Sequence, residues 1–408
     1  MKFFKNTELA KIYNVSEKSV RNWVQATQEG KLDLQLHEKE GRFYVANVTK
    51  NTILIEQLIE KGRKYKNKRA LKTISPKPEF YETFDHKQIL DIISHLTIHH
   101  EIPLPYSYVN GGATYWDDYA NRLANEGTRN MLTATIDLLG ASTDTLDHLV
   151  GGHKYVNIVD LGPGNGMPAK GLLEHFLKLG KLKRYVTLDI SKEMLQIAEK
   201  NIGTWFDGRV KFEGYARDFS RERFDDLFTE DAIGKDESDT PVNIVLLLGA
   251  TLGNLRTPDQ ALWAINNSLG INDLLVYSAK LDTVNSRRYF DFTTSANQKL
   301  AYNHRMILDF LNIDEDLYDV VQNFDEKKQA RSISITPKMA LTVKFTFPQG
   351  FKYIHINKGQ LITVWRYWHH DGPGLIEQFE RNDFDMMQAT KTKDQEFLLL
   401  TSKIKTHK

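Results

Sequence analysis

The clearest hydrophobic segment of the chain lies at residues 155–166, with the sequence YVNIVDLGPGNG. Its β-branched residues lead directly into Asp160, which is typical of a parallel strand with both faces covered. Glycines follow at alternate positions, where they permit positive φ angles. The pattern predicts a buried strand that ends in a glycine turn, followed by an amphipathic helix over residues 167–179.

Three further segments continue this order at the spacing of strand–helix units. RYVTLDIS (residues 184–191) predicts a short strand that ends in an acid, and GYARDFS (residues 214–220) follows it. NIVLLLGATLGNL (residues 243–255) predicts a very apolar strand that opens into a Gly/Asn turn. Strands that alternate with helices indicate a parallel sheet, so we expect an α/β, Rossmann-like fold.

The glycine spacing distinguishes between two kinds of nucleotide cofactor. Asp160, Gly162, Gly164 and Gly166 form D-x-G-x-G-x-G. A dinucleotide fingerprint is G-x-G-x-x-G, with an acidic residue about 20 positions later. Here the third glycine comes one residue early and Met167 stands in its place. The turn therefore favours the methionine part of S-adenosylmethionine.

The other strand ends supply the remaining contacts that this nucleoside needs. The Asp189 carboxylate can accept both ribose hydroxyls, Asp218 can accept from the adenine amino group, and Phe219 can cover the adenine ring. Gly249 lies in the turn after the most apolar strand. The predicted cofactor-binding set is Asp160, Gly162, Gly164, Gly166, Asp189, Asp218, Phe219 and Gly249.

Length and composition narrow the class of protein. A chain of 408 residues suggests two or three domains, and 41% hydrophobic with 26% charged residues is ordinary for a globular protein. The absence of cysteine excludes disulfides, thiolate metal sites and a cysteine nucleophile. The histidine pairs at 99–100 and 369–370 lack partners at metal-ligand spacing, so no metal is expected. No apolar run approaches about 18 residues, so we expect a cytoplasmic protein without a membrane segment.

The charge is concentrated at the beginning of the chain. Residues 1–72 hold 16 Lys and Arg against 8 Asp and Glu, although the whole chain has a net charge of only +1. Residues 7–13 predict a short helix, and Ser16 begins a second one with Lys18 and Arg21 near its start. Residues 34–37 and 42–45 predict a hairpin. This order resembles the small winged helix-turn-helix modules of phage and bacterial regulators, which implies DNA binding.

A second interpretation of this module stays open, because many helix-turn-helix pairs only pack against the rest of a protein. The basic segment 61–72 is either a phosphate contact or a solvated linker. Ser75-Pro76-Lys77-Pro78 then marks the domain boundary.

An aromatic segment precedes the predicted sheet. Residues 84–100 predict a helix ended by prolines, and YSYVNGGATYWDDY follows at residues 106–119. We expect Tyr108 and Tyr115, together with Tyr106 and Trp116, to line a substrate pocket. The alternative is ordinary packing between domains. Residues 128–139 predict the helix that leads into the first strand.

These motifs resemble the class I S-adenosylmethionine-dependent methyltransferases over residues 128–280. Within that class the chain is most similar to the histidine-specific N-alpha-methyltransferase family of ergothioneine biosynthesis. DLGPGNG, YVTLDIS, ARDF and LLLGATLGNL carry the resemblance. The resemblance implies that Asn254, in the L-G-x-T-x-G-N turn, holds the carboxylate of an amino-acid substrate. It also implies a second domain built from the pre-core segment and an insertion, in which residues 302–305 (YNHR) match a Tyr/Phe-Asn segment of the family.

The expected organisation has five parts: a helix-turn-helix-like module (1–72), a linker and substrate lid (73–127), a methyltransferase core (128–281), an inserted α+β substrate domain (282–350), and strands with a helix that complete the core (351–408). The chain departs from the family at its E-x-S-x-[KR]-[FY] stretch, where Val364 and Arg366 stand near the expected Glu and Ser. A P-E-Y-Y segment before the core is also missing. Histidine specificity is therefore not carried over.

The sequence thus predicts an S-adenosylmethionine-dependent methyltransferase that N-methylates the amine of an amino acid or a related small metabolite. The alternative is a DNA-binding regulator, or a nucleic-acid-targeting protein, whose body senses or uses S-adenosylmethionine. Enzymes that methylate DNA amines usually carry [DNS]-P-P-[YFW] after the fourth strand. This chain has GATLGN at that place. No residue is predicted as the catalytic base.

Overall fold

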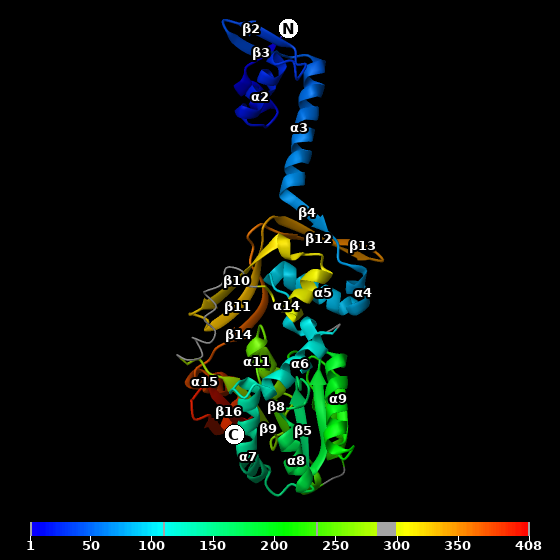
Figure 1. Ribbon diagram of the computed structural model, residues 1–408, viewed down its shortest axis with the longest axis vertical. Coiled ribbons are helices and arrows are strands. Elements are labelled where there is room, and N and C mark those ends of the chain that lie inside the picture. Colours follow the sequence, from blue (N-terminus) through cyan, green and yellow to red (C-terminus); the bar gives the residue numbers. More distant parts are fainter. Residues whose placement is uncertain (1, 109–110, 234–235, 284–298, 407–408) are drawn as a thin grey trace. The chain divides into compact units, whose positions relative to one another are not determined.

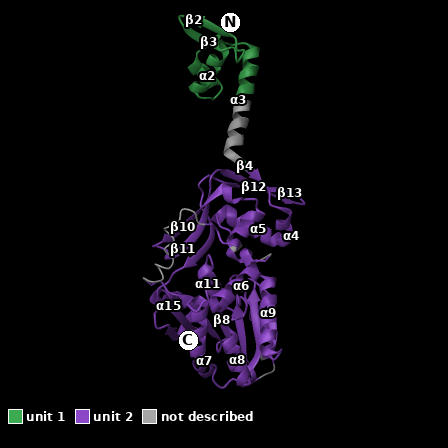
Figure 2. Cartoon of the chain, in the orientation of Figure 1, with its two compact units in different colours: residues 1–72 green, residues 73–408 purple. Residues whose placement is uncertain are grey.

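The chain divides into two compact units, Met1–Lys72 and Thr73–Lys408 (Figures 1 and 2). The computed structural model describes residues 2–108, 111–233, 236–283 and 299–406. The side chains of residues 60–71 lie outside the described part, so nearly all of the predicted basic segment does too.

The first unit contains two short helices and a hairpin. Ser16 caps the second helix, where its Oγ accepts a hydrogen bond from the Ser19 N–H at 3.1 Å. Leu9, Val20 and Val24 form the core between the helices. The elements are β1 (Phe3–Phe4), α1 (Asn6–Ile12), α2 (Glu17–Gln28), β2 (Leu36–Lys39), β3 (Arg42–Ala46) and α3 (Thr49–Ala70), with strand order β1-β3-β2. The predicted helix pair and hairpin are present, and DNA binding stays a prediction.

The second unit is built on a mixed sheet. Among the described residues this sheet has seven strands, in the order β15-β16-β9-β8-β5-β6-β7. The central strands β9, β8, β5, β6 and β7 are parallel, and β15 and β16 are antiparallel. Residues in β5 and β8 are buried on both faces, as the apolar runs predicted. The strands are β5 (Val156–Leu161), β6 (Leu182–Asp189), β7 (Phe212–Ala216), β8 (Val242–Leu247), β9 (Leu274–Lys280), β15 (Phe384–Lys391) and β16 (Phe397–Ile404).

Helices cover both faces of this sheet, which confirms the α/β, Rossmann-like class (Figure 1). One face packs against α7 (Met131–Val150), α8 (Lys170–Lys178) and α9 (Lys192–Phe206). The opposite face packs against α12 (Pro258–Asn266) and α15 (Gly372–Arg381). Short helical turns connect these elements: η3 (Asp225–Phe228), α10 (Thr229–Ala232), η4 (Glu237–Asp239) and α11 (Thr251–Asn254).

The segment before the core and the insertion after β9 share a separate hydrophobic core. Phe80, Ile92 and Leu96 from the first pack with Ile307, Leu311 and Phe345 from the second. The helices are α4 (Pro78–Thr83), α5 (His86–Ser94), the π-helix η1 (His95–His99), the 3₁₀-helices η2 (Leu104–Tyr108) and η5 (Glu315–Leu317), α6 (Gly112–Asn125) and α14 (Tyr302–Phe310).

Two small sheets complete this second domain, with strand orders β10-β11-β14 and β13-β12-β4 in the described residues. Their strands are β4 (Leu71–Ile74), β10 (Tyr318–Asp325), β11 (Ala330–Pro337), β12 (Ala340–Phe347), β13 (Gly350–Ile356) and β14 (Ile362–Trp368). The predicted boundary at residue 350 is therefore wrong. β13 and β14 pair with β12 and β11 rather than with the core sheet, so the insertion extends to Trp368.

No helix among the described residues is both long and apolar enough to span a membrane.

Candidate functional site

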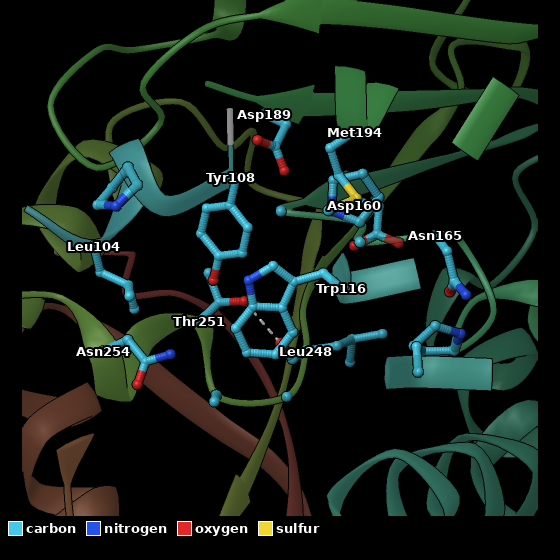
Figure 3. Close-up of a pocket in the computed structure, with 18 of the residues that line it drawn as sticks. Leu104, Tyr108, Trp116, Asp160, Asn165, Asp189, Met194, Leu248, Thr251 and Asn254 are labelled. Atoms are coloured by element: carbon cyan, nitrogen blue, oxygen red, sulfur yellow. Dashed lines mark hydrogen bonds between the residues drawn. The ribbon is translucent and has the colours of Figure 1, made fainter. Parts of the chain in front are cut away.

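A cavity of about 430 Å³ opens at the carboxyl ends of β5, β6 and β8 (Figure 3). Its floor is the glycine turn after β5, and η2 and α6 of the pre-core segment line it from the other side. In parallel sheets, ligands bind at this edge where the strand order reverses, and here β5 has β6 on one side and β8 on the other.

The turn after β5 lies against the cavity as predicted, except for its last glycine. Gly162 and Gly164 line the cavity with φ angles of +70° and +57°. A Cβ on Gly162 would lie 3.2 Å from Cγ2 of Thr251, so the turn also needs a small residue there. Gly166 does not line the cavity, because it packs against Ile202 and Trp205 of α9.

Asp160 lies buried at the end of β5. Its Oδ2 accepts a hydrogen bond from the Tyr185 hydroxyl at 2.7 Å, whereas its Oδ1 is buried without a partner among the described residues. Burial and the nearby charge of Asp189 raise the pKa of Asp160 to about 7, although the bond from Tyr185 opposes this shift. This carboxylate is therefore held in a place that favours a neutral acid or a bound cation.

Asp189 lies at the end of β6, where it lines the cavity next to Tyr108 (Figure 3). Its Oδ1 accepts a hydrogen bond from the backbone N–H of Ser191 at 2.8 Å. Burial raises the pKa of Asp189 to about 6. A carboxylate at this place in the cavity suits the predicted contact with ribose hydroxyls.

Asp218 and Phe219 line the same cavity beyond β7. Oδ1 of Asp218 accepts hydrogen bonds from the backbone N–H and the hydroxyl of Ser220, at 3.1 and 2.5 Å. Phe219 is 8% exposed, and its ring lies near Gly162. The structure thus brings the acid of the β7 loop and one aromatic face together beside the glycine turn.

The turn after β8 supplies the other half of the cavity. Gly249 lines it, and its N–H donates to Oγ of Ser278 at 2.8 Å. Asn254 ends α11 and also lines the cavity, with its Oδ1 buried and unpartnered among the described residues. The predicted substrate residue therefore lies across the cavity from the Asp189 strand end (Figure 3).

The aromatic pre-core segment contributes a different pair of side chains from the predicted one. Tyr108 and Trp116 line the cavity, with ring centroids 5.5 Å apart. Tyr115 does not line it, because its ring packs against Trp116 and Tyr302. Tyr106 is also turned away, and its hydroxyl donates to Asp91 at 2.8 Å.

Strand β14 holds two cavity residues that the sequence analysis did not single out. Trp365 and Tyr367 line the cavity, whereas Val364 is buried in the second domain and Arg366 pairs with Glu101 at 2.5 Å. Val364 and Arg366, the residues near the family's Glu and Ser positions, thus lie outside the cavity, and the residues next to them line it. The alternation of side chains along a strand was the signal for the correct pair, but it needed the register of β14 to be read.

The cavity fits S-adenosylmethionine by the chemistry of its walls. Asp160 Oδ1, Asn254 Oδ1 and Trp116 Nε1 are buried polar atoms without partners among the described residues, and all three residues line the cavity. Buried polar groups are nearly always hydrogen-bonded, so these atoms indicate a polar ligand. Asp160 and the glycine turn would hold the methionine end, Asp189 the ribose, and Asp218 with Phe219 the adenine.

Comparisons with solved structures give methyltransferases at low similarity. A S-adenosylmethionine-dependent methyltransferase from Clostridium acetobutylicum ATCC 824 has 12% identity and a TM-score of 0.38, with 73% of this chain and 100% of that chain covered. The sugar N-methyltransferase KedS8 from Streptoalloteichus sp ATCC 53650 has 11% identity and a TM-score of 0.35, with 71% and 93% covered. A search of curated proteins gives no match.

The sequence model of one protein family matches residues 91–403, which include nearly all of the core sheet, the second domain from within α5 onward, and every cavity residue named above. Its description is "Histidine-specific methyltransferase, SAM-dependent". The predicted resemblance, the predicted cofactor and the assignment as a methyltransferase are thereby confirmed. The chain belongs to the family of histidine-specific, S-adenosylmethionine-dependent methyltransferases.

Proposed function

We propose that this methyltransferase N-methylates the amine of an amino acid or a related small metabolite. The observation that carries the proposal is Asn254, whose carboxamide lies in the cavity with a buried Oδ1 that has no partner in the described part of the chain. A carboxamide presents an acceptor and two donors, so one side chain can bind both the ammonium and the carboxylate of an amino acid. The cavity volume of about 430 Å³ suits a cofactor with a small acceptor.

When bound, S-adenosylmethionine would supply the methyl group, whose bond to sulfur would be replaced by a bond to a neutral acceptor nitrogen, with the electron pair left on sulfur and one proton released from the nitrogen. The chain's own contribution is to position the acceptor and to exclude water. Tyr108 and Trp116 cover the cavity between its two halves. Burial and the charge of Asp189 raise the pKa of Tyr108, so its phenol stays protonated and is no base.

The variant Asn254→Ala tests the proposal. We expect the catalytic efficiency with amino acids to fall roughly tenfold to a hundredfold, because the acceptor's polar head loses its hydrogen-bonding partner. Binding of S-adenosylhomocysteine, measured by calorimetry, should not change. The exposed Asn267→Ala at the end of α12 is the matched control. Undiminished turnover of the true acceptor by Asn254→Ala would contradict the proposal.

For the first unit we propose DNA binding as a second function. The observation that favours it is a polar face on α2, where Lys18, Arg21 and Asn22 are all exposed. Binding of the full chain to duplex DNA should weaken steeply with salt, because Lys and Arg displace counterions from phosphates. The double variant Lys18→Ala/Arg21→Ala should lower the slope of log affinity against log salt by about two. Lys352→Ala, exposed on β13, is the control, and salt-independent binding or none would refute the idea.

A further inference from the structure

Strand β14 presents its two faces to different surroundings. Val364 is 3% exposed within the core of the second domain, and the Arg366 guanidinium pairs with the buried Glu101. The alternate residues Trp365 and Tyr367 line the cavity. Their rings lie nearly parallel, with an angle of 8° and a centroid distance of 6.3 Å. One face of β14 is therefore a flat aromatic wall of the cavity.

Close contacts hold this wall beside Asn254. A Cβ on Gly253 would lie 2.5 Å from Cε2 of Tyr367, so only glycine lets the ring pack on this turn. On the other face of β14, the indole N–H of Trp368 donates to the carbonyl oxygen of Leu255 at 2.7 Å. The residues on both sides of Asn254 are thus fixed to β14. Any ligand bound by Asn254 has the aromatic wall next to it.

The wall offers little to a polar side chain. The carboxylates among the described cavity residues are Asp160, Asp189 and Asp218, which lie at or just after the carboxyl ends of β5, β6 and β7. β14 brings no carboxylate, carboxamide or aliphatic hydroxyl to the described lining. An imidazole placed there would lose its hydrogen bonds with water without gaining an acidic partner. A flat apolar ring would instead gain contact area and favourable ring geometry.

We propose that the methyl acceptor is an amino acid with a benzene or indole ring, that is, of the phenylalanine, tyrosine or tryptophan type and not histidine. Its ring packs against Trp365 and Tyr367, while Asn254 holds its amino and carboxylate groups. This inference rests on the proposed N-methylation of an amino acid and specifies its side chain. Trp365 and Tyr367 are thus specificity-determining residues. The amino and carboxylate groups of the acceptor would be bound by α11 and its ring by β14, two elements that pack directly against each other.

The first test is a panel of acceptors for the full-length protein with S-adenosylmethionine. The panel contains L-tryptophan, L-phenylalanine, L-tyrosine, L-histidine and L-leucine, and S-adenosylhomocysteine release is measured. The best aromatic amino acid should exceed histidine in kcat/KM roughly tenfold to a hundredfold, as expected for a buried polar ring without a partner. Turnover of histidine or leucine equal to or above the aromatic amino acids overturns the inference.

The second test uses variants of the wall. Trp365→Ala should raise the KM for the aromatic acceptor about tenfold, because the acceptor's ring loses its contact with the indole and the apolar area buried there. Trp365→Phe should restore most of the loss, because it keeps a flat ring. Calorimetric binding of S-adenosylhomocysteine should stay unchanged in both, which separates a specificity role from misfolding. Trp263→Ala, 60% exposed on α12, is the control. An unaltered KM in Trp365→Ala overturns the inference.

The two proposals fail in different ways. If the protein binds S-adenosylhomocysteine but methylates no amino acid, the proposed N-methylation fails and this inference falls with it. If it methylates histidine or an aliphatic amino acid in preference to aromatic ones, the proposed function stands and the aromatic wall is not a specificity element.

Discussion

The variant Asp189→Ala is expected to bind S-adenosylmethionine about a hundredfold more weakly than the wild-type protein. The carboxylate lies at the end of β6 and lines the cavity, and its Oδ1 is oriented by the Ser191 N–H. Hydrogen bonds to a charged group contribute about 1.5–3 kcal/mol each, so the loss of two at the lower end of this range, about 3 kcal/mol, corresponds to an effect of this size. Calorimetric titration with S-adenosylhomocysteine, which carries the same ribose, measures the loss of this contact.

Two further variants make the Asp189 result specific. Asp144→Ala removes an exposed carboxylate from α7 and should leave the affinity unchanged. Asp189→Asn keeps one acceptor oxygen and should lie between the wild type and the alanine variant. Misfolding is not expected, because burial raises the pKa of Asp189 to about 6 and its removal relieves an unfavourable buried charge. An affinity equal to the wild-type value in Asp189→Ala would refute the assigned ribose contact.

The parts of the fold that local sequence determines were predictable. β5, β6 and β8 are apolar runs that end in acids or glycines, and they occupy the predicted strand ends. Because the carboxyl ends of parallel strands meet at one edge of a sheet, strand order along the chain was enough to bring Asp160, Asp189 and Asn254 to one cavity. Ser16 could be predicted as a helix cap because capping is also local: it depends on residues three positions apart.

The parts that depend on distant contacts were not predictable in this way. β14 reads as a strand, but its place in the second domain comes from pairing with β11 and from the ion pair between Arg366 and Glu101, which are 265 residues apart. The same contacts set the register that turns Trp365 and Tyr367 into the cavity. Since a shift of one residue reverses the faces of a strand, an alignment that is uncertain by one residue could not tell which of these neighbours faces the cavity.

The orientation of α6 likewise decides which aromatic side chains of the segment before the core face the cavity. Tyr115 and Trp116 are neighbours on α6, about 100° apart around the helix axis. Hydrogen bonds from the core hold α6 in the rotation that turns Trp116 to the cavity: Asn165 Nδ2 donates to Asp117 at 2.9 Å, and the N-cap Gly111 N–H donates to Glu193 at 3.3 Å. These contacts join the pre-core segment to the core, and no local pattern encodes them.

The variant Asp160→Asn is expected to be more stable than the wild-type protein at neutral pH, although it weakens the cofactor site. Asp160 is 1% exposed, and its pKa is raised from the usual 3.8 to about 7, mainly by burial. Asparagine has nearly the same shape, can still accept the hydrogen bond from Tyr185, and carries no charge to bury. The buried carboxylate at the bottom of the cofactor cavity thus lowers the stability of the apo protein, and this cost is tolerated because the group serves ligand binding.

The pH dependence of the free energy of unfolding shows whether the charge of Asp160 causes this difference in stability. Between about pH 4 and pH 7 the folded state keeps a proton on Asp160 that the unfolded state has released. The wild-type free energy of unfolding therefore falls across this window as the pH rises, and the asparagine variant lacks this contribution. The stability advantage of Asp160→Asn should grow by about 2–3 kcal/mol between pH 5 and pH 8. Urea unfolding of both apo proteins at these two pH values measures it. An advantage that stays constant with pH would show that Asp160 is already ionised in the folded apo protein at pH 5.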